Sequence, residues 1–173
     1  MSNLDMSGLY HKIVFELKPD EDSYPPVTAE SLWGILRAPG IYEIDNAPYY
    51  TYGISKGDYL STIETNGHLT ASNIVQQGGH STLRVFVGNS YDKKNIIDAV
   101  QEMGATCSST EGMSLFSVDI PAECNFWAID EYLTAISDGE NVAYEDDCLQ
   151  HKNIDPPRYI ECLSFASISN IKH

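Results

Sequence analysis

The hydrophobic pattern changes partway along the chain, close to residue 80. Before that point apolar and polar residues alternate in short runs, whereas after it two segments repeat their apolar residues every three or four positions. Alternation places apolar side chains on one face of a strand, and the longer repeat places them along one side of a helix. The sequence therefore predicts an α+β fold with a β-rich subdomain over residues 1–80 and a mixed subdomain over residues 81–155.

Short strand-like runs, each ended by turn residues, fill the first subdomain. The first run repeats apolar residues at every second position from Ile13 to Leu17. The strongest local signal is Asn66-Gly67, because a type I′ hairpin turn requires positive φ at both of its central residues. Runs this short, with no helical repeat between them, predict a small antiparallel β-sheet or partial barrel.

Strands and helices alternate in the second subdomain. Asp92 can cap a helix near Asp92–Met103, Gly104 stands where glycine often ends a helix, and Phe126–Ser137 carries a second apolar stripe. In chain order the expected elements are a strand at 81–87, the first helix, extended segments at 105–109 and 113–120, the second helix and a short strand at 142–144. This β-α-β-β-α-β order is typical of a ferredoxin-like unit, and we expect the first subdomain to pack on it.

The remaining residues, 156–173, are too apolar for a solvated linker. Their apolar members are Tyr159, Ile160, Leu163, Phe165, Ile168 and Ile171. We therefore expect this C-terminal tail to pack back on the body of the protein as a strand.

Acidic residues outnumber basic ones by 25 to 10, which gives a formal net charge of −15 at pH 7. Such a charge repels nucleic acid and anionic membrane surfaces. The first residues lack the basic and apolar regions of a signal peptide, and nowhere do apolar residues run together long enough to span a membrane. The expectation is a cytoplasmic protein that binds neither nucleic acid nor membrane.

The acidic residues gather in one stretch. Between residues 119 and 155 there are ten of them, and Lys152 is the only basic residue. An acidic surface that contains aromatic residues can dock into a basic groove on another protein. The residues expected to bind such a partner are Asp130, Glu131, Tyr132, Asp138, Glu140, Tyr144, Glu145, Asp146 and Asp147. The alternative interpretation is an exposed helix face and a solvated loop that only confer solubility.

No motif in the sequence indicates catalysis or a nucleotide cofactor. Glycine-rich phosphate loops are missing from it. His80 stands beside the hydroxyls of Ser81 and Thr82, but consecutive residues of a strand point to opposite faces, which is poor geometry for a catalytic pair. An enzyme or small-ligand-binding domain with a site around His80 and Arg84, completed by carboxylates that folding brings near, stays open as an alternative function.

The four cysteines, at positions 107, 124, 148 and 162, are widely spaced and form no C-x-x-C pair. We expect them to be reduced core thiols. Cys148 and His151 alone have a ligand-like spacing, and a zinc site there would need two further ligands from elsewhere. The expectation is a protein without metal or cofactor that is not an enzyme.

Several short motifs, in a fixed order, are similar to those of a bacterial family. They are Ile13–Leu17 with Pro19–Asp22, Tyr24–Val27, Glu30–Trp33, Ile44–Asn46 before Pro48, Gly53–Ser55 with Gly57-Asp58, Gly79–Thr82 before Arg84, Val118–Pro121, and Tyr144-Glu145 before Cys148-Leu149. With them the chain resembles domain of unknown function family 4265 over about residues 11–151. The resemblance implies no catalytic residues, and the tail beyond Pro156 is an addition to the shared pattern.

Small acidic proteins of this kind are often encoded beside secreted polymorphic toxins. The resemblance therefore implies an immunity protein of contact-dependent growth inhibition, which would form a heterodimer with a basic toxin domain. Nuclease toxins have basic grooves for the phosphate backbone, and an acidic surface would occlude such a groove. An EndoU-like ribonuclease is the expected toxin.

Overall fold

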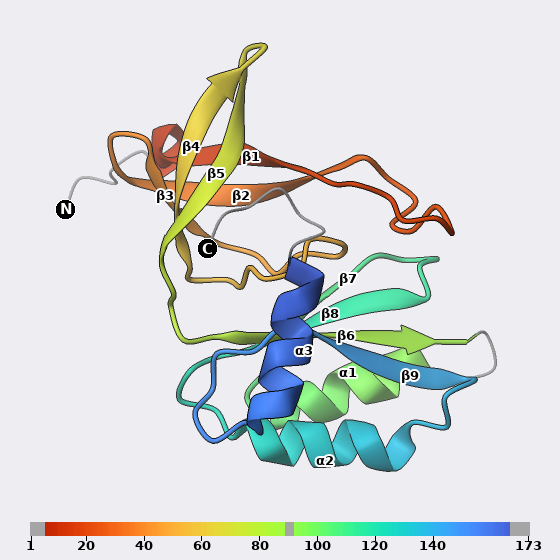
Figure 1. Cartoon of the computed structure of the whole chain (residues 1–173). Coiled ribbons are helices and arrows are strands. Elements are labelled where there is room, and N and C mark those ends of the chain that lie inside the picture. The colour runs from red at the N-terminus through yellow and green to blue at the C-terminus, as the bar shows by residue number, and fades with distance from the viewer. Residues whose placement is uncertain (1–5, 89–91, 167–173) are drawn as a thin grey trace.

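Five strands form a closed barrel in the first part of the chain (Figure 1). The computed structural model describes residues 6–88 and 92–166. After a short 3-10 helix at Met6–Leu9, the strands are β1 (Tyr10–Glu16), β2 (Ala29–Ala38), β3 (Ile41–Ile44), β4 (Tyr59–Thr65) and β5 (His68–Gln76). Consecutive strands pair antiparallel, and a parallel pairing of β1 with β5 closes the barrel. The β-rich part that the sequence predicts is thus present, and its sheet has no free edge.

The turn at Asn66-Gly67 joins β4 to β5 as the sequence predicts. Asn66 has a φ of 52° and Gly67 a φ of 78°, and Thr65 pairs with His68 across the turn. The alternating apolar residues of the barrel strands point inward and form a core of their own. Its buried members are Ile13, Phe15, Leu32, Tyr42, Ile44, Ile54 and Leu60.

A four-stranded antiparallel sheet forms the second part of the chain, and two helices cover one of its faces (Figure 1). In chain order its elements are β6 (Ser81–Val87), α1 (Lys93–Glu102), β7 (Thr106–Ser109), β8 (Leu115–Ile120), α2 (Phe126–Ile136) and β9 (Val142–Cys148). The strands lie side by side in the order β7-β8-β6-β9. The protein is therefore a mixed α/β fold with two sheets.

Both predicted helices are confirmed, and local capping explains where they begin. The Asp92 side chain accepts a hydrogen bond from the backbone of Lys94, and the Asn125 side chain accepts one from Ala128. Each cap satisfies one of the amide groups that a helix start leaves without an internal partner. The apolar stripes of α1 and α2 then pack on β6 and β8 in the second core.

The two faces of β6 have different surroundings. Leu83 and Val85 lie in the core beneath the helices, whereas Arg84 and Phe86 alternate with them and point to the other face. That face is turned toward the barrel, whose loops lie above it in Figure 1. The junction between the two sheets therefore forms around Arg84.

The tail forms a helix, α3 (Pro156–Ala166), so the expectation of a strand is wrong. Proline fits the first turn of a helix, because the amides there have no partner within the helix. The backbone of Tyr159 donates to the Asp155 carbonyl, and Cys162 is buried in the second core. α3 thus contacts β9 and packs on the body of the protein. The predicted contributions of Ile168 and Ile171 lie outside the described residues.

Candidate functional site

Arg158 of α3 binds two of the acidic residues that the sequence assigned to a partner. Its guanidinium donates two hydrogen bonds to Asp130, at 2.7 and 3.0 Å, and two to Asp146, both at 2.7 Å. The Tyr144 hydroxyl donates to Asp130 at 2.8 Å. Burial raises the pKa of Asp130, but the hydrogen bonds from Arg158 and Tyr144 lower it more, so its net shift is downward. At these residues the protein's own tail helix supplies the positive charge that was expected from a partner.

Asp147 lies in the interior and pairs with Arg84. Both side chains are 0% exposed, and Nη2 of Arg84 lies 2.7 Å from Oδ1 of Asp147. Burial raises the pKa of Asp147, and the Arg84 guanidinium opposes this shift because it stabilises the ionised carboxylate. The expectation that Asp147 belongs to an exposed acidic surface is therefore wrong, because the side chain neutralises a buried cation instead.

Four of the predicted partner-binding residues are exposed: Glu131, Asp138, Glu140 and Glu145. The Asp138 carboxylate also accepts hydrogen bonds from the backbone amides that follow it, including that of Val142 at 3.0 Å. These bonds lower the pKa of Asp138 and fix the turn after α2. The structure thus exposes four of the predicted acidic residues, whereas Asp130, Asp146 and Asp147 form ion pairs within the protein.

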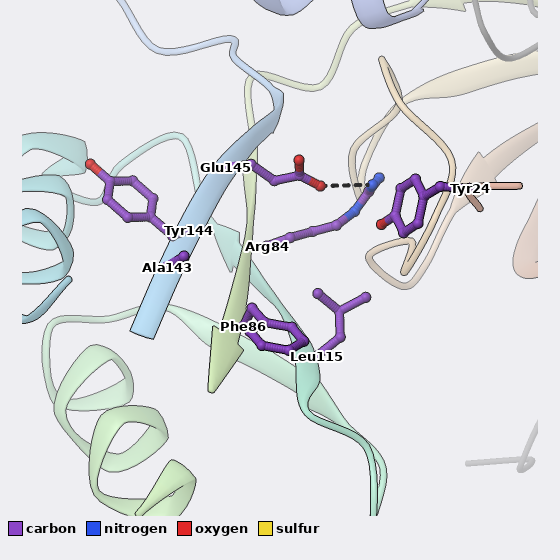
Figure 2. Close-up of a pocket in the computed structure, with 7 residues that line it drawn as sticks. All are labelled: Tyr24, Arg84, Phe86, Leu115, Ala143, Tyr144 and Glu145. Atoms are coloured by element: carbon purple, nitrogen blue, oxygen red, sulfur yellow. Dashed lines mark hydrogen bonds and ion pairs between the residues drawn. The ribbon is translucent and has the colours of Figure 1, made fainter. Parts of the chain in front are cut away.

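The two aromatic residues predicted to bind the partner, Tyr132 and Tyr144, are both partly buried. Tyr132 is partly buried against the second core. The Tyr144 hydroxyl lies 2.7 Å from the Thr134 hydroxyl in addition to its bond to Asp130. In Figure 2 the Tyr144 side chain extends away from Arg84, on the opposite side of β9. The predicted role of these rings in partner binding stays a prediction.

Arg84 connects the four-stranded sheet to the barrel. Its Nη2 donates to the Thr51 carbonyl at 2.6 Å, and its guanidinium carbon lies 4.2 Å from the centre of the Tyr52 ring. Glu145 joins the cluster, because its Oε1 accepts from the Tyr52 hydroxyl at 3.0 Å and from Arg84 at 3.4 Å. The buried guanidinium of Arg84 is thus held by groups from both parts of the chain. The first part supplies the Tyr52 ring and the Thr51 carbonyl, and the second part supplies the carboxylates.

Glu30 of β2 holds the loop that lies above Arg84. Its carboxylate accepts hydrogen bonds from the backbone amides of Tyr49, Tyr50 and Thr51 at 2.6 to 3.0 Å. The Thr51 hydroxyl donates to the same carboxylate at 2.8 Å. One side chain of the barrel therefore sets the position of the carbonyl that Arg84 binds.

A pocket of about 310 Å³ opens beside Arg84 (Figure 2). The residues that line it are Tyr24, Arg84, Phe86, Leu115, Ala143, Tyr144 and Glu145. Figure 2 shows the Tyr24 ring next to the guanidinium, with Phe86 and Leu115 on the adjoining part of the sheet. Most of this lining is apolar or aromatic, and Glu145 adds an exposed carboxylate to it.

His80 and Arg84 do not form one site. His80 directly precedes β6 and Arg84 lies within it, and four residues of extended chain span about 13 Å. The Nδ1 atom of His80 lies 2.7 Å from Oδ1 of Asp119, whose other oxygen accepts from the Thr106 hydroxyl at 3.1 Å. This separation does not support the alternative function, which requires His80 and Arg84 to share one site.

Cys148 and His151, the pair with a ligand-like spacing, are engaged in local contacts. The Ser81 hydroxyl lies 2.7 Å from Nδ1 of His151, and Nε2 of this histidine lies 3.0 Å from the Pro121 carbonyl. The Gln150 side chain donates to Cys148 at 3.3 Å. In residues 6–88 and 92–166, no three His, Cys, Asp or Glu side chains are grouped so that they could hold a metal ion. None of the helices in the same part of the chain is both long and apolar enough to cross a membrane.

Sequence patterns do not identify several residues of this region, among them Arg158, Tyr24 and Phe86. Phe86 could have been found, because it occupies the position on β6 that alternates with the core residues Leu83 and Val85. Arg158 stands far from Asp130 and Asp146 in the chain, and no local pattern indicates their pairing. Tyr24 lies in a loop, so no periodic pattern points to it.

Comparison with known proteins identifies the family and the fold. The model of a domain of unknown function, DUF4265, matches residues 30–144. A crystal structure of a hypothetical protein from Neisseria gonorrhoeae is similar, with a TM-score of 0.67 and 17% sequence identity over 83% of this chain and 96% of that chain. At this identity the likeness concerns the fold alone. No functionally curated protein matches the chain. Because the family model covers well over half of the sequence, this chain belongs to the DUF4265 family.

Proposed function

We propose that this protein is an immunity protein that binds a cognate basic toxin domain and occludes its active-site groove. The bound pair would be a heterodimer, and the protein itself would not be an enzyme. A nuclease, with an EndoU-like ribonuclease as the first to test, fits the proposal because its groove has to attract a polyanion. Such an inhibitor would act in the cytoplasm, where an incoming nuclease reaches its substrate.

The observation that carries this proposal is the charge on the surface of the second part of the chain. From residue 92 to residue 155, nine acidic residues are exposed but only two lysines, Lys94 and Lys152. The exposed acids are Asp92, Glu102, Glu111, Glu123, Glu131, Asp138, Glu140, Glu145 and Asp155. Such an imbalance attracts a basic surface and orients it during approach.

The fold gives this acidic surface a rigid support. The element order β-α-β-β-α-β and the strand order β7-β8-β6-β9 support our inference that the second part is a ferredoxin-like unit. Glu131 lies on α2, and Asp138 and Glu140 follow directly after it. Carboxylates on a helix and its anchored turn lose little conformational freedom when a partner binds.

The proposal is tested with the toxin domain encoded beside the gene. Association and dissociation rates are measured at low and at physiological salt, together with the nuclease activity of the mixture. We expect tight binding, loss of nuclease activity and an association rate that falls as salt rises. Absence of binding, or binding that leaves the nuclease active, would reject the immunity function.

Charge reversal on α2 and on the turn that follows it locates the surface. The double variant Glu131→Lys with Glu140→Lys is expected to slow association at least several-fold at low salt, since like charges then face each other. The matched control reverses two exposed acids of the first part, Glu21 and Glu64, and should change the rate much less. Equal effects of the two double variants would show that only net charge matters and would remove α2 and the turn after it from the binding surface.

A further inference from the structure

Two hollows lie side by side between the barrel loops and the open face of the four-stranded sheet. Their shared wall consists of Tyr24, Phe86 and Leu115. The first is the 310 Å³ pocket beside Arg84 and Glu145, and the second, of about 340 Å³, is completed by Asp22, Ser23, Pro26, Tyr50, Met113 and Ser114. We call the two together the aromatic cleft.

Two aromatic rings of the shared wall are exposed to solvent. Phe86 is 47% exposed and Tyr24 is 38% exposed. The Tyr24 ring also packs edge to face on Tyr50, with centroids 6.3 Å apart, and this contact supports its position in the absence of a partner. Preorganised aromatic rings beside a hollow are typical of the anchor points in protein interfaces.

The charges in the first hollow favour a cation over an anion. The positive charge of Arg84 is balanced by buried Asp147 at 2.7 Å, so the carboxylate of Glu145 is left in excess. The Glu145 side chain is 46% exposed, and its Oε1 carries the bonds to Tyr52 and Arg84. Among the described residues, none donates a hydrogen bond to the second oxygen, Oε2. This oxygen is available to an incoming ammonium or guanidinium group.

We propose that the aromatic cleft binds an extended segment of the partner in which an arginine or lysine stands two residues from an apolar residue. The basic side chain enters the first hollow, lies against Phe86 and pairs with Glu145, while the apolar side chain enters the second hollow against Tyr50 and Met113. Side chains two residues apart in an extended chain point the same way, which matches two adjacent hollows. The inference rests on the proposed basic partner and names the place where it is anchored.

A peptide titration of the complete protein tests the cleft without the toxin. The probes are acetyl-Leu-Ala-Arg-amide and the same peptide with uncharged citrulline in place of arginine, followed by NMR chemical shifts. We expect saturable, millimolar binding of the arginine peptide that shifts the amides of Phe86, Leu115 and Glu145, and binding of the citrulline peptide weaker by several-fold. No saturation, shifts elsewhere, or equal binding of both peptides would overturn the proposal.

Two variants separate the roles of the ring and the charge. Phe86→Ala should weaken the arginine peptide about tenfold. Glu145→Gln should weaken it two- to fivefold and remove the preference over citrulline. The matched controls are Trp33→Ala, which removes a ring 46% exposed on β2, and Glu64→Gln on β4. Controls that weaken binding as much as the cleft variants would contradict the assignment, and Phe86→Leu replaces Phe86→Ala if the latter fails to fold.

The same variants, measured against the toxin domain, distinguish the two proposals. If toxin binding depends on Glu131 and Glu140 but not on Phe86 or Glu145, the cleft is not the anchor and the immunity function stands. If the peptide binds in the cleft but the toxin domain does not bind, the cleft is a peptide site and the immunity function falls.

Discussion

Two arginines, Arg84 and Arg158, each bind a pair of carboxylates, but in different surroundings. Arg84 and its partner Asp147 have no exposed side-chain surface, whereas Arg158 is 24% exposed and its partners Asp130 and Asp146 are 11% and 20% exposed. Arg84 joins the sheet to the barrel, and Arg158 joins the tail helix to α2 and β9. Ion pairs of the same chemistry thus hold two different junctions of the molecule.

The difference in burial determines what remains when a partner is removed. Loss of Arg84 leaves the Asp147 carboxylate in a place that water does not reach, and an uncompensated buried charge costs much free energy. Loss of Arg158 leaves carboxylates that can be hydrated at the surface, where salt and water also weaken the original pair. We therefore expect the burial of the ion pair, more than its number of hydrogen bonds, to decide which arginine contributes more to the free energy of unfolding.

The largest expected effect comes from Arg84→Met. Because Asp147 then stays buried without a counter-ion, the free energy of unfolding should fall by about 3–5 kcal/mol. Urea denaturation measures this change. The double variant with Asp147→Leu removes the stranded charge and should recover a large part of the loss. If the single variant is as stable as the wild type, Arg84 is not the junction that the geometry indicates.

A smaller effect is expected from Arg158→Ala. The loss of its four hydrogen bonds to partly exposed carboxylates should lower the free energy of unfolding by about 1–2 kcal/mol. Burial raises the pKa of Cys162 on α3 to about 12, so loosening of the helix should speed alkylation of this thiol. Cys107 in the sheet, whose pKa burial also raises to about 12, serves as the unaffected control. A loss as large as that of Arg84→Met would contradict the ranking by burial.

The smallest effect is a dependence of stability on pH. The pKa of Asp130 is lowered in the folded state, so its stabilising contribution is complete above the ordinary aspartate value of about 3.9 and is lost as the pH falls through the folded-state value. The difference in unfolding free energy between the wild type and Asp130→Asn should be about 1 kcal/mol at neutral pH and should shrink below about pH 4. A difference that is constant across this range would show that the Arg158 contact does not depend on the charge of Asp130.

Local sequence patterns predicted the elements better than they predicted their surroundings. The α1 and α2 helices and the Asn66-Gly67 turn follow from spacing and caps within a few residues. For the tail the sequence predicts a strand, which is wrong, although Pro156 and Pro157 are compatible with a helix start. A proline can end a helix that precedes it or stand in the first turn of a helix that follows it. The two prolines alone therefore do not indicate that a helix begins here.

The acidic residues show why the site was only partly predictable. Charge composition treats every carboxylate of the 119–155 stretch alike and assigns all of them to the surface. The structure buries Asp147 because Arg84 stands on the adjacent strand, and it covers Asp130 because α3 returns to the sheet. Such pairings join residues that are distant in sequence, so only the folded chain shows which acids remain for a partner.

The parallel pairing of β1 with β5, which closes the barrel, has a consequence for folding during synthesis. β1 is synthesised before the other barrel strands and can pair with β2 soon afterwards, but within the barrel its other edge is covered by β5, through Ile13 beside Leu69 and Val14 beside Thr70. The pairing of β1 with β5 closes a long loop. This step is slow because the chain loses conformational entropy before the contacts between the two strands form. During synthesis, one edge of β1 therefore stays open until the whole barrel sequence has left the ribosome, and a chaperone or a neighbouring chain can pair with it during that interval.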